Sequence, residues 1–243
     1  MARPIRNRGA FATKPSVYGH SVANAPLQVW RPASSAVDIL IFAGIHGEEP
    51  DSTVLLSRAL RSLSKRPTSC AVVLCANPDG MQCGTRGNSN GVDLNRNFPS
   101  SNWSAEPVAH QWGVDSDRTV LLSPGEAPCS EPEVEALLEL IADLDPKCVI
   151  SIHSPLGVID DPNGTELGRE LAARTGLPRT TLPYEDTPGS FGSWANDTGL
   201  ASITYELPDS SIWSMLPVHV PILQELLEKG LAVVPANSRG GGC

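Results

Sequence analysis

The sequence has no long hydrophobic run. Nowhere in its 243 residues does an apolar stretch approach the ~18 residues that a membrane-spanning helix needs. The first eleven residues carry three arginines, but no apolar segment follows them, so we expect no secretory signal. These absences argue against a membrane-embedded protein, and we expect no membrane partner.

Positive charge is also scarce. Lys and Arg number 18 against 27 Asp and Glu, which gives a net charge of −9 and a pI of about 5.0. A chain with this balance has little general attraction for nucleic acid or for anionic membranes. We therefore expect no nucleic-acid partner, although the balance leaves room for a local basic pocket.

Paired cysteine motifs are missing as well. The six cysteines include no C-x-x-C pair, and in a chain without a secretory signal we expect reduced thiols and a cytoplasmic location. Hydrophobic residues make up 40% of the chain and charged residues 19%, which is ordinary for a globular protein. Because no internal repeat or long linker stands out, we expect one domain over residues 1–243, with a flexible tail from about residue 237.

Short apolar runs alternate with helical periodicity along the chain. The runs predict buried strands at residues 37–43, 70–76, 147–152 and 201–207, and the periodicity predicts helices at 51–63, 163–175 and 217–229. A further helix is expected to open with Ser130 as N-cap, because Glu133 follows three residues later, whereas Asn77 to Gly80 predicts a turn. This alternation predicts an α/β fold with a mixed, mostly parallel central sheet and helices on both faces.

Imidazole and carboxylate groups stand where the expected strands end. His46 and Glu49 follow the first strand, His153 follows the third, and Glu206 lies near the end of the fourth. Ligands of such sheets bind outside the carboxyl ends of the strands. Histidine nitrogen with carboxylate oxygen suits zinc, and three protein ligands plus water make a catalytic site. His46 and Glu49 can reach one ion across a strand-to-helix turn, and Glu48 is the rival carboxylate, which its neighbouring position should turn away.

The same histidines have a simpler interpretation. His46 and His153 can be hydrogen-bonded residues near the core rather than metal ligands. The other three histidines, His20, His110 and His219, lack an acidic partner at ligand spacing, so we interpret them as surface or core residues.

The loop after the second strand is unusually rich in functional side chains. It carries Arg86 and Arg96 with few counter-charges, and a long loop of this kind is seldom mere connection. Arginine can bind a carboxylate in a forked arrangement or stabilise an oxyanion. The alternative is that both arginines pair with surface acids, an interaction worth little.

Several motifs together resemble the zinc carboxypeptidases of the carboxypeptidase A type. They occur in that family's order, at residues 46–49 (HGEE), 77–80 (NPDG), 93–98 (DLNRNF), 151–154 (SIHS) and 204–207 (TYEL). Residues 8–11 (RGAF), 88–99 (NSNGVDLNRNFP) and 187–194 (TPGSFGSW) also resemble one bacterial branch, the murein peptide amidases. That branch hydrolyses the amide bond between γ-D-glutamate and meso-diaminopimelate, in peptidoglycan turnover and recycling.

The resemblance implies a zinc-dependent hydrolase acting on a small murein peptide. It implies one Zn²⁺ per chain, held by His46, Glu49 and His153, with Glu206 as general base. Such a base accepts a proton from the attacking water and passes it to the leaving amine.

The resemblance also implies how the substrate is held. Arg86 would polarise the scissile carbonyl and stabilise its oxyanion, while Asn95 and Arg96 would bind the free carboxylate of the departing residue. Tyr184 is our candidate for the family's mobile tyrosine, although its spacing to the following motif is one residue too long.

The far end of diaminopimelate carries a second carboxylate and an ammonium group, which need partners of their own. The candidates are Asp160 and Asp161, and the segment from Glu185 to Thr187 that leads into Gly189 and Ser190. Related enzymes often have a cis peptide just after this histidine, so we also expect a cis bond between Ser154 and Pro155.

Two other functions fit parts of the sequence. An N-acyl amino acid deacylase of the aspartoacylase and succinylglutamate desuccinylase type shares the motif around His46 and the residues Asp93 to Arg96. A non-catalytic protein that binds wall peptides could keep the scaffold, but the presence of Glu206 and of all three expected zinc ligands argues against it.

Overall fold

The computed structural model of the chain describes residues 9–111, 119–183 and 187–234. A six-stranded sheet lies at its centre, in the order β4 (Cys70–Val73), β3 (Ile39–Ala43), β7 (Cys148–His153), β10 (Ala201–Glu206), β8 (Ile159–Asp160) and β9 (Arg179–Thr180). The first four strands run parallel, β8 runs antiparallel to β10, and β9 runs parallel to β8. The mixed, mostly parallel sheet expected from the sequence is confirmed.

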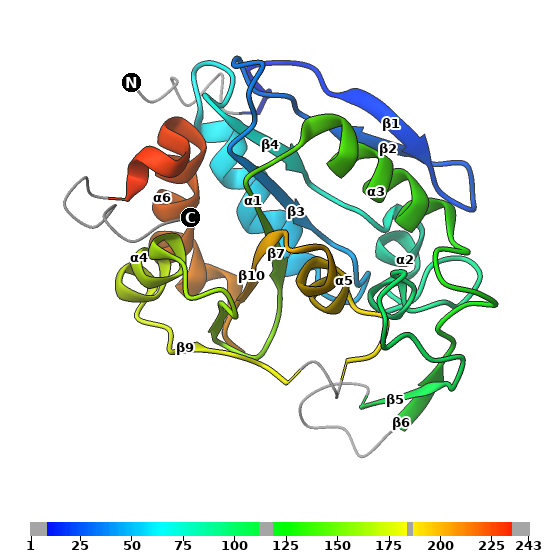
Figure 1. The fold of residues 1–243 in the computed structure, drawn as a ribbon. Coiled ribbons are helices and arrows are strands. Elements are labelled where there is room, and N and C mark those ends of the chain that lie inside the picture. The colour runs from blue at the N-terminus through cyan, green and yellow to red at the C-terminus, as the bar shows by residue number, and fades with distance from the viewer. Residues whose placement is uncertain (1–8, 112–118, 184–186, 235–243) are drawn as a thin grey trace.

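Helices cover both faces of this sheet (Figure 1). One face packs against α1 (Pro50–Ser62), α4 (Glu166–Thr175) and α6 (Ile212–Lys229), and the other against α3 (Pro132–Leu144) and α5 (Phe191–Thr198). Strand β3 shows why its sequence is apolar throughout. Ile39 and Ile41 belong to the core on the first face, and Leu40 and Phe42 to the core on the second. A strand buried on both faces needs apolar side chains at every position.

Two helix starts differ from the sequence prediction. The expected turn at Asn77 is wrong, because residues Pro78–Cys83 form the short helix α2. The side chain of Asn77 caps it by accepting a hydrogen bond from Gly80 N, and Pro78 suits the first helical position. The expected N-cap at Ser130 is also wrong. Helix α3 begins at Pro132 with Glu131 at the N-cap position, because proline again fixes the first turn.

Two antiparallel ribbons lie outside the central sheet. One pairs β1 (Ser16–His20) with β2 (Pro26–Val29), and the other pairs β5 (Val108–Gln111) with β6 (Thr119–Leu122). Short 3₁₀ helices complete the described elements, η2 (Leu94–Arg96) and η4 (Gly230–Val233). The β5–β6 ribbon stands at the lower right of Figure 1, and its inner side chains matter for the site described below.

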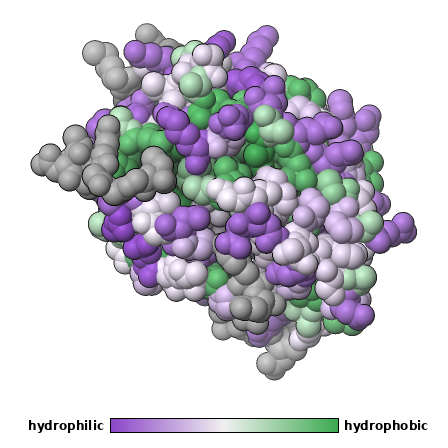
Figure 2. All heavy atoms as spheres, viewed as in Figure 1, coloured by the Kyte–Doolittle hydropathy of each residue, from purple (hydrophilic) through white to green (hydrophobic). Residues whose placement is uncertain are grey.

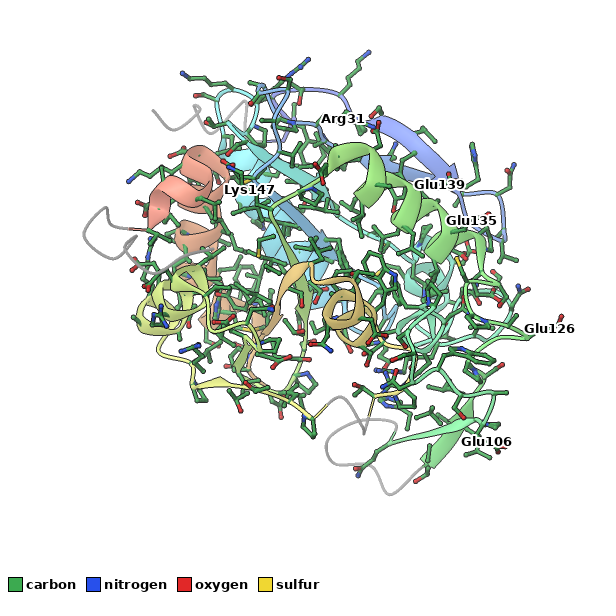
Figure 3. The ribbon with its side chains drawn as sticks, in the orientation of Figure 1. Arg31, Glu106, Glu126, Glu135, Glu139 and Lys147 are labelled. Atoms are coloured by element: carbon green, nitrogen blue, oxygen red, sulfur yellow. The ribbon has the colours of Figure 1, made fainter. Side chains whose placement is uncertain are left out.

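The surface agrees with the acidic composition. The face seen in Figure 2 is a mosaic in which hydrophilic residues surround smaller hydrophobic areas. Glu135 and Glu139 project from the outer side of α3, and Glu126 and Glu106 lie at the rim of the molecule (Figure 3). None of the described helices is long and apolar enough to span a membrane.

Candidate metal centre and substrate cavity

Two neighbouring parallel strands bring His46, Glu49 and His153 together. His46 and Glu49 lie on the turn between β3 and α1, and His153 is the last residue of β7, which pairs with β3. One potential ligand atom from each residue lies within 4.8 Å of the others. All three side chains are buried. The sheet edge therefore gathers the three residues that were expected to bind zinc, in a group that could hold a metal ion.

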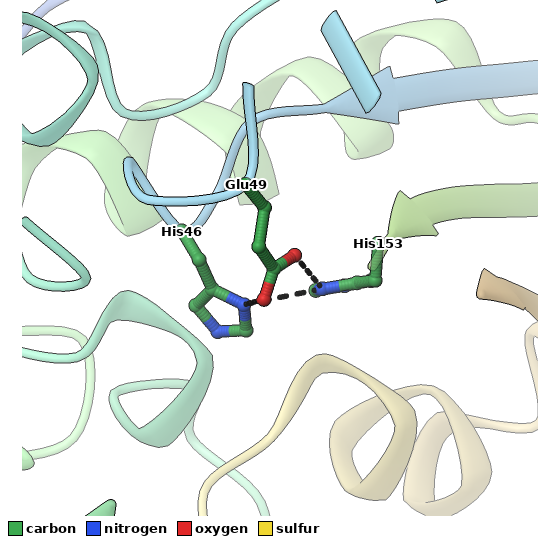
Figure 4. A group of neighbouring side chains, drawn as sticks. All are labelled: His46, Glu49 and His153. Carbon is green, nitrogen blue, oxygen red and sulfur yellow. Dashed lines mark hydrogen bonds and ion pairs between the residues drawn. The ribbon is translucent and has the colours of Figure 1, made fainter. Parts of the chain in front are cut away.

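Glu49 lies between the two imidazole rings, as Figure 4 shows. Its Oε1 is 2.7 Å from Nδ1 of His46, and its Oε2 is 3.1 Å from Nδ1 of His153. The two Nδ1 atoms are 3.2 Å apart. The carboxylate also accepts a hydrogen bond from the backbone N–H of Ser154 at 3.2 Å. Both histidines therefore present the same ring nitrogen to one point.

The charges of this group strongly affect one another. Burial and the nearby Arg86 lower the pKa of His46, but the carboxylates of Glu49 and Asp93 outweigh them and raise it to about 9. Burial would raise the pKa of Glu49, yet the two histidines hold it well below its usual value. The carboxylate is thus ionised, as a metal ligand must be.

The turn that carries His46 and Glu49 packs closely against helix α2. A Cβ added to Gly47 would lie 2.0 Å from the backbone carbon of Gly80, so only glycine fits there. The side-chain amide of Asn77 donates hydrogen bonds to the carbonyls of Ile45 and Arg86, at 3.1 and 3.2 Å. The NPDG segment therefore fixes the position of the first ligand turn relative to the arginine loop.

Asp93 joins the metal ligands to the arginine loop. Its Oδ1 lies 3.4 Å from Nε2 of His46, on the side of the ring away from Glu49. Its Oδ2 accepts a hydrogen bond from Nε of Arg86 at 2.8 Å, and Oδ1 accepts another from Asn95 N. A carboxylate behind a ligating histidine fixes the ring orientation and raises its basicity. The sequence analysis did not assign this role to Asp93.

Arg86 is surrounded by carboxylates. Besides Asp93, its Nη1 lies 3.2 Å from Oε1 of Glu48 and 3.4 Å from Oε1 of Glu49. Burial lowers the pKa of Arg86, but these acids outweigh it and hold the pKa above its usual value. The acids that pair with Arg86 are those of the cavity rather than of the outer surface. Glu48 lies outside the three-ligand group, with its carboxylate at Arg86.

Arg96 has a very different environment. Leu94 and Phe98 insert into the core, and the side chain of Asn97 donates a hydrogen bond to the carbonyl of Pro124. Asn95 and Arg96 line the cavity. Nη1 of Arg96 donates to the carbonyl of Asn95 at 2.7 Å, but its buried Nε has no hydrogen-bond partner among the residues that the structure describes. None of the ion pairs among the described residues includes Arg96. Burial lowers its pKa.

The amide of Asn95 is oriented by the protein. Its Oδ1 accepts a hydrogen bond of 2.9 Å from the backbone N–H of Phe191, the first residue of α5. The side-chain oxygen is therefore engaged, which leaves the NH₂ group as the donor toward the cavity. With Arg96 beside it, this part of the cavity wall can bind an anion.

Glu206 lies next to His153, its register partner on β7. Its Oε2 accepts a weak hydrogen bond from Leu156 N at 3.4 Å. Burial raises the pKa of Glu206, against the lowering effect of His153. A raised pKa makes a carboxylate a better proton acceptor. The Ser154–Pro155 peptide between these elements is cis, as the sequence analysis predicted.

One cavity of about 950 Å³ contains these groups. The site residues expected from the sequence that line it are His46, Glu49, Arg86, Asn95, Arg96, His153, Asp160, Ser190 and Glu206. The hydroxyl of Ser190 caps α5 by accepting from Ser193 N at 3.0 Å, so it is already engaged. Asp160 is buried in the cavity wall. Tyr184 lies outside the described residues.

The environment of His110 differs from the one predicted from the sequence. It is not a surface or core residue without an acidic partner, because its Nε2 lies 3.1 Å from Oε1 of Glu48 at the cavity. His110 lies on β5, and the β5–β6 ribbon places it beside Glu48, which is distant in the sequence. No local sequence pattern predicted this ribbon. His219 agrees with the core interpretation, since its ring nitrogen lies 2.7 Å from the hydroxyl of the buried Tyr205.

The three-ligand group fits a zinc ion. Zinc binds imidazole nitrogen and carboxylate oxygen, and a site with three protein ligands keeps a position open for water or substrate. Here the two Nδ1 atoms and the Glu49 carboxylate point to one place, and Asp93 supports His46 from behind. The group also opens into the cavity rather than into the core.

Known proteins are similar to this sequence over most of its length. Murein peptide amidase A of Escherichia coli strain K12 is 47% identical over 214 residues, which cover 87% of this chain and 88% of the relative. Murein peptide amidase A of Vibrio campbellii is 41% identical over 228 residues, covering 93% of this chain and 92% of the relative.

Solved structures of related proteins have a similar fold. The murein-tripeptide amidase of Escherichia coli O157 superimposes with a TM-score of 0.88 at 44% identity, covering 93% of this chain and 96% of that one. Bovine thrombin-activatable fibrinolysis inhibitor shares the fold, with a TM-score of 0.69 at 22% identity over 91% of this chain and 88% of that one. Residues 5–166, more than half of the chain, match the zinc carboxypeptidase family. The chain belongs to the zinc carboxypeptidase family.

Proposed function

We propose that this protein is a zinc-dependent amidase that hydrolyses the bond between γ-D-glutamate and meso-diaminopimelate in murein peptides. The observation that carries the proposal is one cavity that contains the His–Glu–His group, Glu206 and a half-buried arginine, Arg96, that forms no ion pair with the described residues. The relatives named as murein peptide amidases support the choice of substrate.

The metal end supplies the reactive groups. When bound by His46, Glu49 and His153, a zinc ion is a Lewis acid that lowers the pKa of water and polarises a carbonyl oxygen. Glu206 accepts the proton of the attacking water at its carboxylate and gives it to the nitrogen of the departing amine. Its burial suits this role because burial raises the pKa of Glu206.

The two arginines contact different groups of the substrate, Arg86 the scissile carbonyl oxygen and Arg96 the α-carboxylate. Arg86 is held in place by Asp93 through a 2.8 Å hydrogen bond, and it stabilises the negative charge that develops on the scissile carbonyl oxygen. Arg96 and the NH₂ group of Asn95 bind the α-carboxylate of the departing residue. This carboxylate lies beside the scissile amide in the substrate, so the same contacts set the position of the bond to be cut.

The cavity can contain a small peptide. Ligand cavities of about 300–1,000 Å³ bury most of the surface of a drug-sized molecule, and this one measures about 950 Å³. We accordingly propose a murein tripeptide as the partner. A cytoplasmic location, in keeping with peptide recycling, remains a prediction that cell fractionation would test.

Mass spectrometry of the products tests the proposal. The purified, zinc-loaded protein is incubated with L-Ala-γ-D-Glu-meso-diaminopimelate, and release of free diaminopimelate together with the dipeptide L-Ala-D-Glu is expected. The Glu206→Gln variant is the matched control for contaminating activity. An N-acyl amino acid is assayed in parallel. Turnover of that compound with none of the tripeptide would contradict the proposal in favour of a deacylase, and binding without any turnover would indicate a peptide-binding protein.

A further inference from the structure

A row of polar side chains crosses three strands at the floor of the cavity. Ser151 on β7 and Asp160 on β8 are both register partners of Thr204 on β10. Register partners on adjacent strands point to the same face of a sheet. All three residues line the cavity, so a hydroxyl, a hydroxyl and a carboxylate stand side by side.

This floor row lies at a defined depth below the metal end. His153 and Glu206 form the next register pair on the same face, two residues further along β7 and β10. Two residues of a strand span roughly 6.6–6.8 Å. A group bound at the floor row is therefore separated from the scissile bond by about the length of a short aliphatic chain.

Asp160 is a buried carboxyl that has no cationic partner among the described residues. Its side chain accepts a hydrogen bond of 2.8 Å from Leu182 N and another from the Thr204 hydroxyl. None of the ion pairs formed by the described residues includes it, whereas its neighbour Asp161 is paired with Arg179 at 2.9 Å. Burial raises the pKa of Asp160. A buried carboxylate is costly unless a cation pairs with it, and here the open side faces the cavity.

We propose that Asp160, supported by Thr204, binds an ammonium group on the side chain of the departing amino acid. The inference rests on the proposed function, because Arg96 and Asn95 must hold the α-carboxylate for the side chain to reach the floor row. Four carbon–carbon bonds separate the two α-type carbons of diaminopimelate, and the far ammonium nitrogen lies one bond beyond, about 6 Å from the first carbon when extended, which is close to the roughly 6.6–6.8 Å depth of the row. Asp160 is then a specificity-determining residue for a diamino acid.

Three tripeptides that differ only in the last residue test the proposal. They end in meso-diaminopimelate, in 2-aminopimelate, which lacks only the far ammonium, and in lysine, which lacks only the far carboxylate. For the wild-type enzyme we expect kcat/KM for the aminopimelate peptide to be about 10²-fold or more below kcat/KM for the diaminopimelate peptide. The reason is that a site with polar partners strongly rejects an analogue that leaves them unpaired. In the Asp160→Asn variant that ratio should fall to within about 3-fold, while the ratio between diaminopimelate and lysine stays nearly unchanged.

Two further variants keep the test sharp. Asp209→Asn removes one negative charge from the exposed edge of the same cavity, and its ratios should equal those of the wild type. Thr204→Val keeps the side-chain shape and removes the supporting hydroxyl, so it should lower the ammonium preference in part. Each ratio compares two substrates on one preparation and is independent of the folded fraction.

The possible results separate the inference from the proposed function. If the wild type cleaves the diaminopimelate peptide without preferring it to the aminopimelate peptide, the role of Asp160 is wrong and the amidase function stands. An unchanged preference in Asp160→Asn, or an equal loss in Asp209→Asn, contradicts the role in the same way. If the wild type cleaves none of the three peptides, the proposed function fails and the inference fails with it.

Discussion

The metal end and the substrate side of the cavity differ in how their charged side chains are paired. At the metal end, Arg86 lies within 3.4 Å of three carboxylates, and Glu49 bridges two histidines. On the substrate side, Arg96 is half-buried and Asp160 is buried, yet the described residues include no ion pair for either. Both ends belong to one cavity.

This difference separates architecture from recognition. Paired buried charges hold one another in place, and removing one partner leaves the others uncompensated. Unpaired buried charges reduce the stability of the free protein, and they are worth keeping where a ligand completes them. We therefore assign the metal end to chemistry, and Arg96 and Asp160 to the charges of the substrate.

The largest expected effect is at the metal end. Glu206→Gln preserves the shape of the side chain and removes the proton acceptor, so kcat should fall by about 10²–10⁴-fold. KM should change much less, and metal analysis should still find one zinc per chain. Turnover within a few-fold of the wild type, or loss of the zinc, would remove Glu206 from its proposed role.

Matched substitutions of the two arginines test the comparison through stability. Arg86→Met leaves Asp93 and Glu48 without their cation and should reduce the free energy of unfolding by about 3–5 kcal/mol. Arg96→Met removes a cation that forms no ion pair with the described residues, so it should leave stability unchanged or raise it. Chemical denaturation of both variants in the same metal state measures the difference. Equal losses would show that the two ends are not electrostatically distinct.

Arg96 should matter for substrate instead. Charge-assisted hydrogen bonds contribute about 1.5–3 kcal/mol each, so Arg96→Met should lower kcat/KM for the tripeptide by about 10–100-fold. Arg96→Lys should recover only part of this loss, because an ammonium group cannot make the forked contact of a guanidinium. Steady-state kinetics of the two variants check the prediction, and full activity of the Lys variant would contradict forked binding.

The smallest effect is expected at His110. Its partner Glu48 remains in contact with Arg86 when His110 is lost, and partly exposed ion pairs are worth about 0–1 kcal/mol. His110→Gln should therefore change kcat/KM by less than about 5-fold. A loss comparable to that of Arg96→Met would place His110 among the substrate-binding groups.

Much of this molecule could be predicted from local sequence. Continuous apolar runs gave the buried strands β3, β4, β7 and β10, because a strand covered on both faces leaves no polar position. The chemistry at their ends followed, since parallel strands bring their carboxyl ends to one edge. The grouping of His46, Glu49 and His153 could thus be expected before any side chain was placed.

The remaining features depend on contacts between distant segments. The β5–β6 ribbon has alternating, partly exposed residues and no strong periodic signal, so the position of His110 was missed. Asp93 acts through Arg86 and His46, which only the folded loop brings near it. Asn77 and Pro78 are typical both of a turn and of a helix start, and in the structure they begin helix α2. Helix α6 begins at Ile212, ahead of the predicted start at Pro217, because Ser211 provides its cap.

Calorimetric titration of the Glu206→Gln variant with two peptides tests the central claim, that substrate charges complete the unpaired end of the cavity. One peptide is L-Ala-γ-D-Glu-meso-diaminopimelate, and in the other the α-carboxylate beside the scissile amide is converted to an amide. We predict that the first binds at least about 10-fold more tightly, and that adding Arg96→Met abolishes the difference. Equal affinity of the Glu206→Gln variant for both peptides would contradict the account.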